Sequence, residues 1–522
     1  MGAPAVVADI TSWNARLRPE HPAIVFDGRV QTFAEHAQRV YRLANVLLGY
    51  GLRPQDRVAI LAENCPEYLE AYAACEVTGF IACPINFRLA SPEMAYVLKN
   101  IEPRALIFDV AYSEQVSGLE AELQGCTLLE FDCAGQTRAT SYETSLTQAS
   151  PEPVVMQPRP EDAAYIVHTS GTTGTPKGAV LGQRAQCSIG KAIGQEAGLS
   201  ADDRGLISQP LFHVGAKFLQ LAHHLRGAAV YLHRGFAAGA VWRALRSDGI
   251  TTMQLVPTML AQLLSHDGDK ACDGAPELHT IFYSTAPIRQ SLLQRGLERF
   301  GQVFLQQYGS TEGGPVSSLL KDQHTSGDSA HERERLRSAG RPCAGVEVRI
   351  VDETGEPCPA GQAGEIEVRH SDLMLGYWRD QDATAEAFHG DWLRMGDIGL
   401  LDERGFLFIV DRKQDMIVSG GENVYPREVE AALEQHPAVA EVAVIGLPSE
   451  LWGEAVHAMV VSSAGSDVTQ EDLIDHCRSL IAGYKVPKRI EFMDSLPRVS
   501  TGKVDKAALR RPYWAGRRRP IV

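Results

Sequence analysis

The sequence predicts an α/β protein with one large and one small domain, and three observations indicate this fold class. Through residue 310, apolar β-branched stretches of strand length alternate with amphipathic stretches of helical length, which is typical of layered, mostly parallel sheets. From about residue 345 the pattern changes to polar–apolar alternation, as in half-exposed antiparallel strands. The length of 522 residues exceeds what one hydrophobic core usually organises.

The first helix and strand illustrate the alternation. Thr32 is a candidate N-cap for a helix that carries apolar residues from Phe33 to Leu47 and ends near Gly51, because a hydroxyl accepts backbone N–H bonds and glycine permits a left-handed end. The apolar strand 57–61 follows. We expect further strands, separated by helical segments, at 80–85, 104–109, 163–167, 228–233, 252–256, 279–283 and 303–308.

Two alternating segments, 346–350 and 365–369, predict a small antiparallel β subdomain. The residues between them, 352–364, are rich in glycine and proline and indicate a turn. We therefore expect this subdomain to complete a large N-terminal domain of layered α/β sheets, residues 1–411.

A compact α+β pattern begins beyond residue 411 and predicts a separate C-terminal domain, residues 412–522. Its expected elements are a helix at 427–436, strands at 439–445 and 455–461, a helix at 470–482 and a strand at 489–493. The basic residues at 510–511 and 517–519 are interpreted as a solvated chain end.

Charge and composition argue against several classes of protein. The chain has 50 Lys and Arg and 65 Asp and Glu, which gives a formal net charge of −15. This charge argues against a nucleic-acid binder, which needs a basic surface. No stretch approaches the roughly 18 apolar residues of a membrane span, so we expect no stable membrane insertion. The ten cysteines contain no C-x-x-C pair, which favours reduced thiols and a cytoplasmic location.

One loop concentrates hydroxyls, glycines and a cation directly after the strand 163–167. It reads Thr169-Ser170-Gly171-Thr172-Thr173-Gly174-Thr175-Pro176-Lys177-Gly178. Glycine lets backbone N–H groups turn toward an anion, and lysine adds a mobile positive charge. The loop therefore predicts a phosphate site. A Walker A loop starting at Gly171 would need glycine at 176 and Ser or Thr at 178, where Pro176 and Gly178 stand, so a P-loop NTPase is disfavoured.

Four further clusters follow this loop in a fixed order. They are QQYGSTE at 306–312, WLRMGD at 392–397, DRKQD at 411–415 and PRVSTGK at 497–503. In order and spacing, the five segments resemble the adenylate-forming superfamily of acyl-CoA synthetases, nonribosomal peptide adenylation domains and firefly luciferase. The resemblance covers nearly the whole chain. It implies a mobile C-terminal domain that rotates between two half-reactions about Gln414, where the family more often carries Asp or Lys.

The resemblance also implies a role for each motif. Lys503 would reach the α-phosphate during adenylation, Glu312 would organise Mg²⁺, and Thr311 would offer its hydroxyl to the α-phosphate. ATP or AMP would contact Thr169, Ser170, Gly171, Thr172, Thr173, Gly174, Lys177, Thr285, Ala286, Pro287, Gln306, Gln307, Tyr308, Gly309, Asp397 and Arg412. The CoA tunnel would be lined by Ser419, Gly420, Gly421 and Glu422.

The acid to be activated is predicted from a separate set of residues. The segment Phe212-His213-Val214-Gly215 matches the family's aromatic-and-histidine stretch, and His213 would lie beside the acyl carboxylate. The rest of the acyl pocket would be formed by Tyr283, Ser284, Gly309, Gly314 and Pro315. Adenylation domains for α-amino acids generally place an aspartate in the first segment, and none is present. We therefore expect an apolar acid, medium-chain or aryl.

The predicted activity is an AMP-forming acid–thiol ligase that uses ATP, Mg²⁺ and coenzyme A. Esterifying a carboxylate to AMP provides the leaving group that a thiol can displace, and this step depends on positioning and charge neutralisation. Two alternatives stay open: an acyl-AMP ligase that loads the pantetheine of a carrier protein, and a nucleotide-binding sensor without turnover. The sequence leaves the acid unidentified and does not distinguish a monomer from a homodimer.

Overall fold

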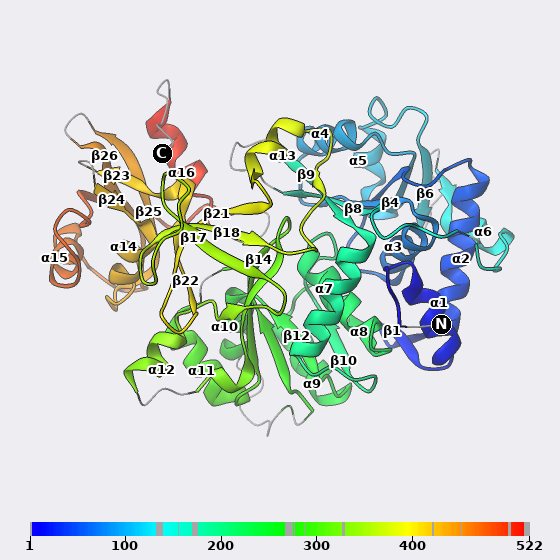
Figure 1. Cartoon of the computed structure of the whole chain (residues 1–522), viewed down its shortest axis with the longest axis horizontal. Coiled ribbons are helices and arrows are strands. Elements are labelled where there is room, and N and C mark those ends of the chain that lie inside the picture. Colours follow the sequence, from blue (N-terminus) through cyan, green and yellow to red (C-terminus); the bar gives the residue numbers. More distant parts are fainter. Residues whose placement is uncertain are drawn as a thin grey trace. The chain divides into compact units, whose positions relative to one another are not determined.

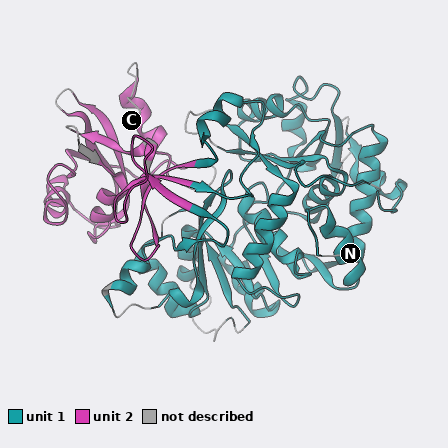
Figure 2. Ribbon diagram, in the orientation of Figure 1, with its two compact units in different colours: residues 1–347, 368–393 teal, residues 348–367, 394–522 magenta. Residues whose placement is uncertain are grey.

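The computed structural model describes residues 3–131, 139–154, 156–169, 176–266, 275, 277–286, 288–325, 329–419, 422–449, 452–499 and 503–515, with the backbone alone for Ala330, Arg412, Gln414, Glu422 and Asn423. Two compact units are present (Figures 1 and 2). Unit 1 comprises residues 1–347 and 368–393, and unit 2 comprises 348–367 and 394–522. Most of the antiparallel β subdomain thus belongs to the compact unit of the C-terminal segment. The domain boundary expected at 411–412 stays a prediction.

Unit 1 contains a larger sheet whose strands come from both halves of the unit. Across the described residues its order is β16-β15-β14-β13-β12-β10-β11-β1-β2. The bounds are β1 (Pro22–Phe26), β2 (Arg29–Thr32), β10 (Arg204–Ile207), β11 (Ala229–Leu232), β12 (Thr252–Leu255), β13 (Thr280–Tyr283), β14 (Phe304–Ser310), β15 (Gly314–Leu319) and β16 (Arg341–Pro342). The strands from β14 through β1 pair in parallel, while β2, β15 and β16 join antiparallel.

A smaller sheet forms the second layer of unit 1, in the order β19-β9-β8-β4-β3-β5-β6-β7 over the segments described. The bounds are β3 (Arg57–Leu61), β4 (Ile81–Pro84), β5 (Ala105–Asp109), β6 (Thr127–Phe131), β7 (Thr140–Ser141), β8 (Ala163–Thr169), β9 (Lys177–Gly182) and β19 (Gly376–Tyr377). Strand β9 runs antiparallel to β8, and β19 runs antiparallel to β9. The other strands are parallel.

Helices cover both sheets, and the pair α7 and α8 lies side by side (Figure 1). Helix α7 (Gln183–Glu196) packs on β8 and β9, and α8 (Val214–His224) packs on β10 and β11, so the pair joins the two layers. The other α-helices described in unit 1 are α1 (Asp9–Leu17), α2 (Phe33–Gly49), α3 (Pro66–Thr78), α4 (Ser91–Ile101), α5 (Ser113–Ser117), α6 (Tyr142–Gln148), α9 (Ala238–Ser247), α10 (Pro257–Ser265), α11 (Gln290–Phe300), α12 (Ala330–Arg335) and α13 (Gln381–Ala387). Within the described ranges no helix is long and apolar enough to cross a membrane.

Unit 2 carries most of an antiparallel sheet and a compact α+β segment. The antiparallel sheet contains β17 (Glu347–Val351), β18 (Gly364–Arg369), β20 (Phe388–His389), β21 (Trp392–Leu401) and β22 (Leu407–Arg412). The α+β segment contains β23 (Ile417–Ser419), β24 (Glu422–Val424), α14 (Pro426–Leu433), β25 (Val439–Ser449), β26 (Gly453–Ser462), α15 (Gln470–Leu480), β27 (Arg489–Phe492) and α16 (Lys506–Trp514).

The expected fold class is confirmed, and local signals account for much of it. Thr32 caps α2, with its hydroxyl accepting from the Glu35 N–H while the Glu35 carboxylate accepts from the Thr32 N–H, which is a capping box. Strands β25 and β26 extend beyond the expected ends because they pair with each other as far as Ser449 and Gly453. That ladder passes through Gly446 and Pro448, which pair with Val456 and Glu454.

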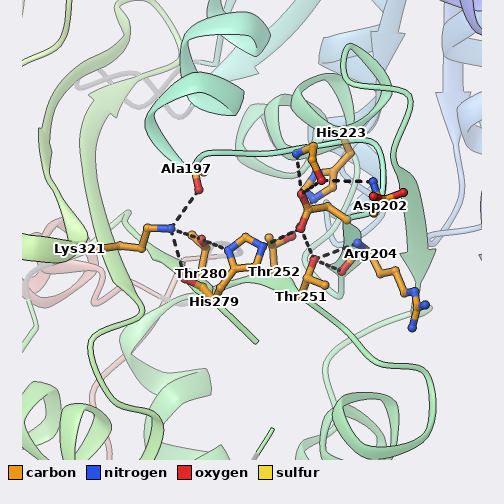
Figure 3. Close-up of polar contacts among 11 residues, drawn as sticks. Ala197, Asp202, Arg204, His223, Thr251, Thr252, His279, Thr280 and Lys321 are labelled. Atoms are coloured by element: carbon orange, nitrogen blue, oxygen red, sulfur yellow. Dashed lines mark hydrogen bonds and ion pairs between the residues drawn. The ribbon is translucent and has the colours of Figure 1, made fainter. Parts of the chain in front are cut away.

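A polar network ties together the amino-terminal ends of β10, β12 and β13 (Figure 3). Asp203 is buried, and its carboxylate contacts His279 Nε2 at 2.6 Å and accepts from Thr251 Oγ1 at 2.7 Å. On the other side of His279, Nδ1 lies 2.9 Å from Thr280 Oγ1, which also accepts from Lys321 Nζ at 3.0 Å. These hydrogen bonds outweigh desolvation and hold the pKa of Asp203 below its usual range. The network connects the amino-terminal ends of these strands, at the opposite end of the sheet from their carboxyl ends.

Candidate active site

The phosphate loop connects two paired strands. Thr169, the last residue of β8, is the register partner of Lys177, the first residue of β9. Lys177 Nζ lies 5.3 Å from the ring centroid of Tyr377 in β19, within the range of a cation–π contact. A Cβ at Gly178 would lie 2.8 Å from Ile166 Cγ2, so the strand needs glycine there.

The remaining expected loop residues, Ser170, Gly171, Thr172, Thr173 and Gly174, lie outside the described residues. The two ends of the loop are nevertheless fixed by the β8–β9 ladder. The cation of Lys177 and the hydroxyl of Thr169 therefore stand at the same end of one hairpin.

Glu312 accepts hydrogen bonds from two hydroxyl groups of the smaller sheet. Thr169 Oγ1 donates to Glu312 Oε1 at 3.0 Å, and the Tyr377 hydroxyl donates to the same oxygen at 3.1 Å. Burial, with the neighbouring Glu312 charge, raises the pKa of Tyr377 well above its usual value, so its hydroxyl stays protonated. The sequence motifs pointed to Thr169 and Glu312, whereas Tyr377 carried no signal.

This arrangement fits a magnesium ion bound together with phosphates. The described part of the chain contains no group of three or more His, Cys, Asp or Glu side chains that could cage a metal. Mg²⁺ is usually bound through one or two carboxylates plus substrate phosphates and water. Glu312 supplies such a carboxylate beside Lys177 and Tyr377, and the two hydroxyl donors occupy only its Oε1.

The motif at 306–312 lies in β14 and the turn that follows it. Strand β15 returns antiparallel, with Gly309 opposite Pro315 and Ser310 opposite Gly314. A Cβ at Gly309 would lie 2.0 Å from the Gly314 carbonyl oxygen, which no side chain could tolerate. Ser310 Oγ accepts from the Gly313 N–H at 2.9 Å and fixes the turn that holds Thr311 and Glu312.

Gln306, one of the expected adenine-binding residues, lies beside a buried hydrogen-bonded pair. The Tyr283 hydroxyl lies 3.3 Å from Gln306 Oε1 and 2.9 Å from His324 Nε2. His324 Nδ1 contacts the Leu320 carbonyl at 2.8 Å, so Nδ1 carries the proton and Nε2 accepts. Burial lowers the pKa of His324 to about 4. Tyr283 therefore donates its single hydroxyl proton to His324, which was not expected from the sequence, and the hydroxyl lies beside Gln306.

The other expected nucleotide residues of unit 1 are half-buried or exposed where the structure describes them. Tyr308 and Gln307 are half-buried opposite Ser317 and Ser318 of β15. Thr285 is exposed with φ +74°, a left-handed conformation that is uncommon for residues other than glycine and often marks functional loops. Ala286 is half-buried beside it, and Pro287 lies outside the described residues.

The expected acyl segment begins with aromatic packing and continues into α8. Phe212 is buried, with its ring edge-on to Phe87 at 5.3 Å and 4.3 Å from the His213 ring. His213 occupies the N-cap position of α8, and Val214 and Gly215 open the helix. The structure thus brings Phe212, His213 and Gly215 to the carboxyl end of β10.

Ser284 and the β14–β15 hairpin complete the expected acyl residues. Ser284 Oγ accepts from Gln254 Nε2 at 3.1 Å, and Gln254 is a residue that the motifs did not indicate. Gly309, Gly314 and Pro315 lie on the hairpin, where Gly314 has φ +60°. The sequence did offer a signal for Gln254, because it is a polar residue near the carboxyl end of an apolar strand.

The remaining expected residues belong to unit 2. Asp397 in β21 is buried and is the register partner of Arg412 in β22. Gln414 lies in the short 3₁₀ helix Lys413–Asp415. The side chains of Arg412, Gln414 and Glu422 are outside the described part of the chain, so their expected roles stay predictions.

Lys503 and the described ends of the expected CoA segment belong to unit 2. Ser419 is buried and pairs with Glu422 across the β23–β24 hairpin, while Gly420 and Gly421 are not among the described residues. Lys503 is exposed, and its carbonyl accepts from the Val499 N–H at 2.9 Å.

Comparison with known proteins supports the same assignment. Two family models match the chain, AMP-binding enzyme over residues 11–378 and AMP-binding enzyme C-terminal domain over residues 428–503. A feruloyl-CoA synthase from an Amycolatopsis species is 38% identical, over 96% of this chain and 98% of that protein. A fatty acid–[acyl-carrier-protein] ligase from Streptomyces coeruleorubidus is 35% identical over 98% and 97%. An indoleacetate–CoA ligase from Aromatoleum aromaticum is 36% identical over 96% and 98%.

Solved structures agree over nearly the full length. ATP-bound MatB from Rhodopseudomonas palustris superposes with a TM-score of 0.88 at 29% identity, covering 97% of this chain and 99% of that one. The o-succinylbenzoate coenzyme A synthetase from Bacillus subtilis, in complex with ATP and magnesium, gives 0.83 at 29% identity, covering 95% and 98%. Because the family models span most of the chain and the site geometry fits a nucleotide, this protein belongs to the AMP-binding enzyme family.

Proposed function

We propose that the protein is an AMP-forming acid–thiol ligase that converts an aryl carboxylic acid into its coenzyme A thioester. The observation that carries this proposal is the convergence of Thr169, Lys177, Glu312 and Tyr377 at one end of the smaller sheet. Carboxylate, cation and hydroxyl groups are the set that magnesium-bound phosphates require. The feruloyl-CoA synthase and the indoleacetate–CoA ligase support an aryl acid.

The first half-reaction joins the acid to AMP. An acyl carboxylate oxygen attacks the α-phosphorus, the bond from that phosphorus to the bridging oxygen breaks, and pyrophosphate leaves. Lys177 would hold the outer phosphates through its charge, and Thr311 would donate to the α-phosphate. Mg²⁺ held by Glu312 would offset the phosphate charge. Lys503 would stabilise charge at the α-phosphate and the acyl carboxylate in this step.

The second half-reaction transfers the acyl group to the thiol. The thiol sulfur attacks the acyl carbon, the bond to the AMP oxygen breaks, and AMP leaves with the electron pair while the thiol proton passes to solvent. The hairpin that contains Ser419 and Glu422 would approach the pantetheine arm through its backbone, because the residues between them are glycines. We propose a cytoplasmic location, because the reaction consumes ATP and coenzyme A. The proposed reaction is the same for a monomer and for a homodimer.

One specific alternative concerns the acceptor. The fatty acid–[acyl-carrier-protein] ligase is nearly as similar to this chain as the coenzyme A ligases. An enzyme of that type would form the same acyl-AMP and pass it to a carrier-bound pantetheine. Faster transfer to a holo-carrier protein than to free coenzyme A would favour this alternative.

The proposed function is tested with a library of aryl and aliphatic acids. The protein is incubated with ATP, Mg²⁺ and coenzyme A, and the products are analysed by mass spectrometry together with pyrophosphate release. We expect AMP, pyrophosphate and an acyl-CoA in equal amounts, with aryl acids preferred. ADP in place of AMP, or nucleotide binding without pyrophosphate release, would reject the proposal.

A further inference from the structure

Polar side chains gather at the carboxyl ends of three neighbouring strands of the larger sheet. Gln209 follows β10, Gln254 lies in β12, and Ser284 follows β13. Leu206 pairs with Met253, and Gln254 pairs with Phe282. Because side chains alternate between the two faces of a sheet, this register places Gln254 on the face opposite Leu206 and Met253. Ser284 accepts a hydrogen bond from Gln254, and Gln209 lies near the same glycine of α8 as Gln254, so both lie beside Gln254 at the end of that face.

That face is covered by α8, while the opposite face is apolar. The opposite face carries Leu206, Met253, Leu255, Ile281 and Tyr283, which pack in one hydrophobic cluster with Trp242 and Leu293. On the polar face, His223 of α8 contacts Thr252 Oγ1 at 2.7 Å. The glutamines therefore lie under the first turn of α8, which contains the end of the expected acyl segment.

Gly215 in that first turn lies close to both glutamine amides. A Cβ at this position would lie 3.1 Å from Gln254 Nε2 and 3.8 Å from Gln209 Oε1. The backbone of α8 thus approaches both amides at a point where any other residue would project a side chain between them. Glycine here keeps a side chain away from both amides.

Both amides are buried and incompletely hydrogen-bonded. Gln209 is 7% exposed and Gln254 is 8% exposed. Across the ranges that the structure describes, Gln209 Nε2 and Gln254 Oε1 have no hydrogen-bond partner. Rotating the Gln254 amide would only exchange its two ends, since the Ser284 hydroxyl can accept or donate. Buried amide atoms without partners are costly and rare in folded proteins, so these two atoms indicate a missing ligand group.

We propose that Gln209 and Gln254 form a polar subsite of the acyl pocket that takes a hydroxyl group on the aryl acid. The inference rests on the proposed ligase function. A hydroxyl oxygen accepts a hydrogen bond from Gln209 Nε2, and its proton is donated to Gln254 Oε1, so one small group satisfies both atoms. An acid without the hydroxyl leaves both amides unpaired and is bound less well in the transition state.

The test compares acids that differ by one hydroxyl. Cinnamate is measured against its 2-, 3- and 4-hydroxy derivatives by pyrophosphate release, for the wild-type protein and for the variants Gln254→Leu and Gln209→Leu. We expect the wild type to favour at least one hydroxylated isomer by about 10- to 100-fold in kcat/KM. Each variant should bring that ratio close to one. A ratio of two acids on one preparation does not depend on the folded fraction.

Gln220→Leu is the matched control. Gln220 is a buried glutamine of α8 whose amide atoms are both paired, with Lys217 Nζ at 2.7 Å and His224 Nδ1 at 2.7 Å. Its substitution should leave the hydroxyl preference as in the wild type. Equal kcat/KM for all four acids, or a preference that survives in both test variants, would overturn the subsite while leaving the ligase in place. Absence of pyrophosphate release with every acid would reject the ligase and the subsite together.

Discussion

Thr169 Oγ1 donates a hydrogen bond to Glu312 Oε1 at 3.0 Å, between residues 143 positions apart in the chain. Thr169 ends β8 in the smaller sheet, and Glu312 follows β14 in the larger sheet. The bond therefore joins the ends of strands from both layers of unit 1. Ligands of α/β proteins bind outside the carboxyl ends of strands, and here both layers contribute to one position.

The first prediction concerns the carboxylate at that position. Glu312→Gln keeps the size of the side chain and removes its charge, so we expect kcat/KM to fall by about 10²- to 10³-fold. The concentration of Mg²⁺ that gives half-maximal rate should rise in parallel, because a neutral amide is a poorer ligand. Pyrophosphate release measured against Mg²⁺ concentration checks both outcomes.

Tyr377→Phe is the matched control for this variant. It removes one hydrogen bond to Glu312 and keeps the aromatic ring near Lys177, so a loss of about tenfold or less is expected. The proposed role of Glu312 is wrong if the two variants lose equal activity and keep the same Mg²⁺ dependence.

The second prediction concerns the close contact inside the β14–β15 hairpin. In Gly309→Ala the new methyl group would lie 2.0 Å from the Gly314 carbonyl oxygen, so the hairpin must move. We expect the free energy of unfolding to fall by at least about 2 kcal/mol. We also expect the rate of adenylation to fall by a larger fraction than the amount of folded protein. Denaturant unfolding and pyrophosphate release provide the two measurements.

A second glycine substitution separates strain from the general effect of alanine. A Cβ at Gly235 would meet nothing within 4 Å, and its φ is not in the left-handed region. The free energy of unfolding of Gly235→Ala should therefore lie within about 0.5 kcal/mol of the wild-type value. If Gly309→Ala behaved in the same way, the hairpin would be more adaptable than its geometry indicates.

The sequence was informative where chemistry or periodicity is local. The strand 57–61 is found without shift as β3, and Thr32 begins α2 as a capping box, because both signals lie within a few residues. The phosphate loop was located through its composition, although most of it lies outside the described residues. Local rules were sufficient for these features.

Long-range partners could not be predicted in the same way. Tyr377 reaches Glu312 from 65 positions away, and His324 reaches Tyr283 from 41 positions away. No periodicity or motif encodes such pairs, since they depend on which strands become neighbours. The same is true of Gln209 and Gln254, whose relationship appears only once β10 and β12 are paired.

The third prediction concerns pH. Burial lowers the pKa of His324 to about 4, against 6.5 for the unfolded chain. The unfolded chain therefore takes up a proton as the pH falls below about 6.5, while folded His324 stays neutral until about pH 4. A depressed folded pKa adds stability that is fully present above 6.5 and is lost on acidification, by up to about 1.4 kcal/mol per pH unit.

His324→Gln removes this proton uptake and keeps a polar side chain. We expect the free energy of unfolding of the variant to fall less steeply between pH 6.5 and pH 4 than that of the wild type. Urea unfolding at half-unit pH intervals measures both slopes. His36 and His168, also with pKa values near 4, would sustain the remaining slope in the variant. Identical slopes in the two proteins would contradict the assignment of a neutral His324.

The last prediction separates the two half-reactions through Lys503. Its positive charge is needed where charge is concentrated at the α-phosphate, and thiol attack on a finished acyl-AMP no longer involves pyrophosphate departure. Lys503→Ala should therefore reduce acyl-AMP formation by at least about 10²-fold and leave thioester formation from supplied acyl-AMP within about threefold. Lys488→Ala, an exposed lysine of the same unit, should change neither rate. Equal loss of rate in both half-reactions would contradict this division of roles. It would mean that Lys503 acts by supporting the local structure, where its carbonyl accepts from the Val499 N–H, and that its side-chain charge does not act specifically in adenylation.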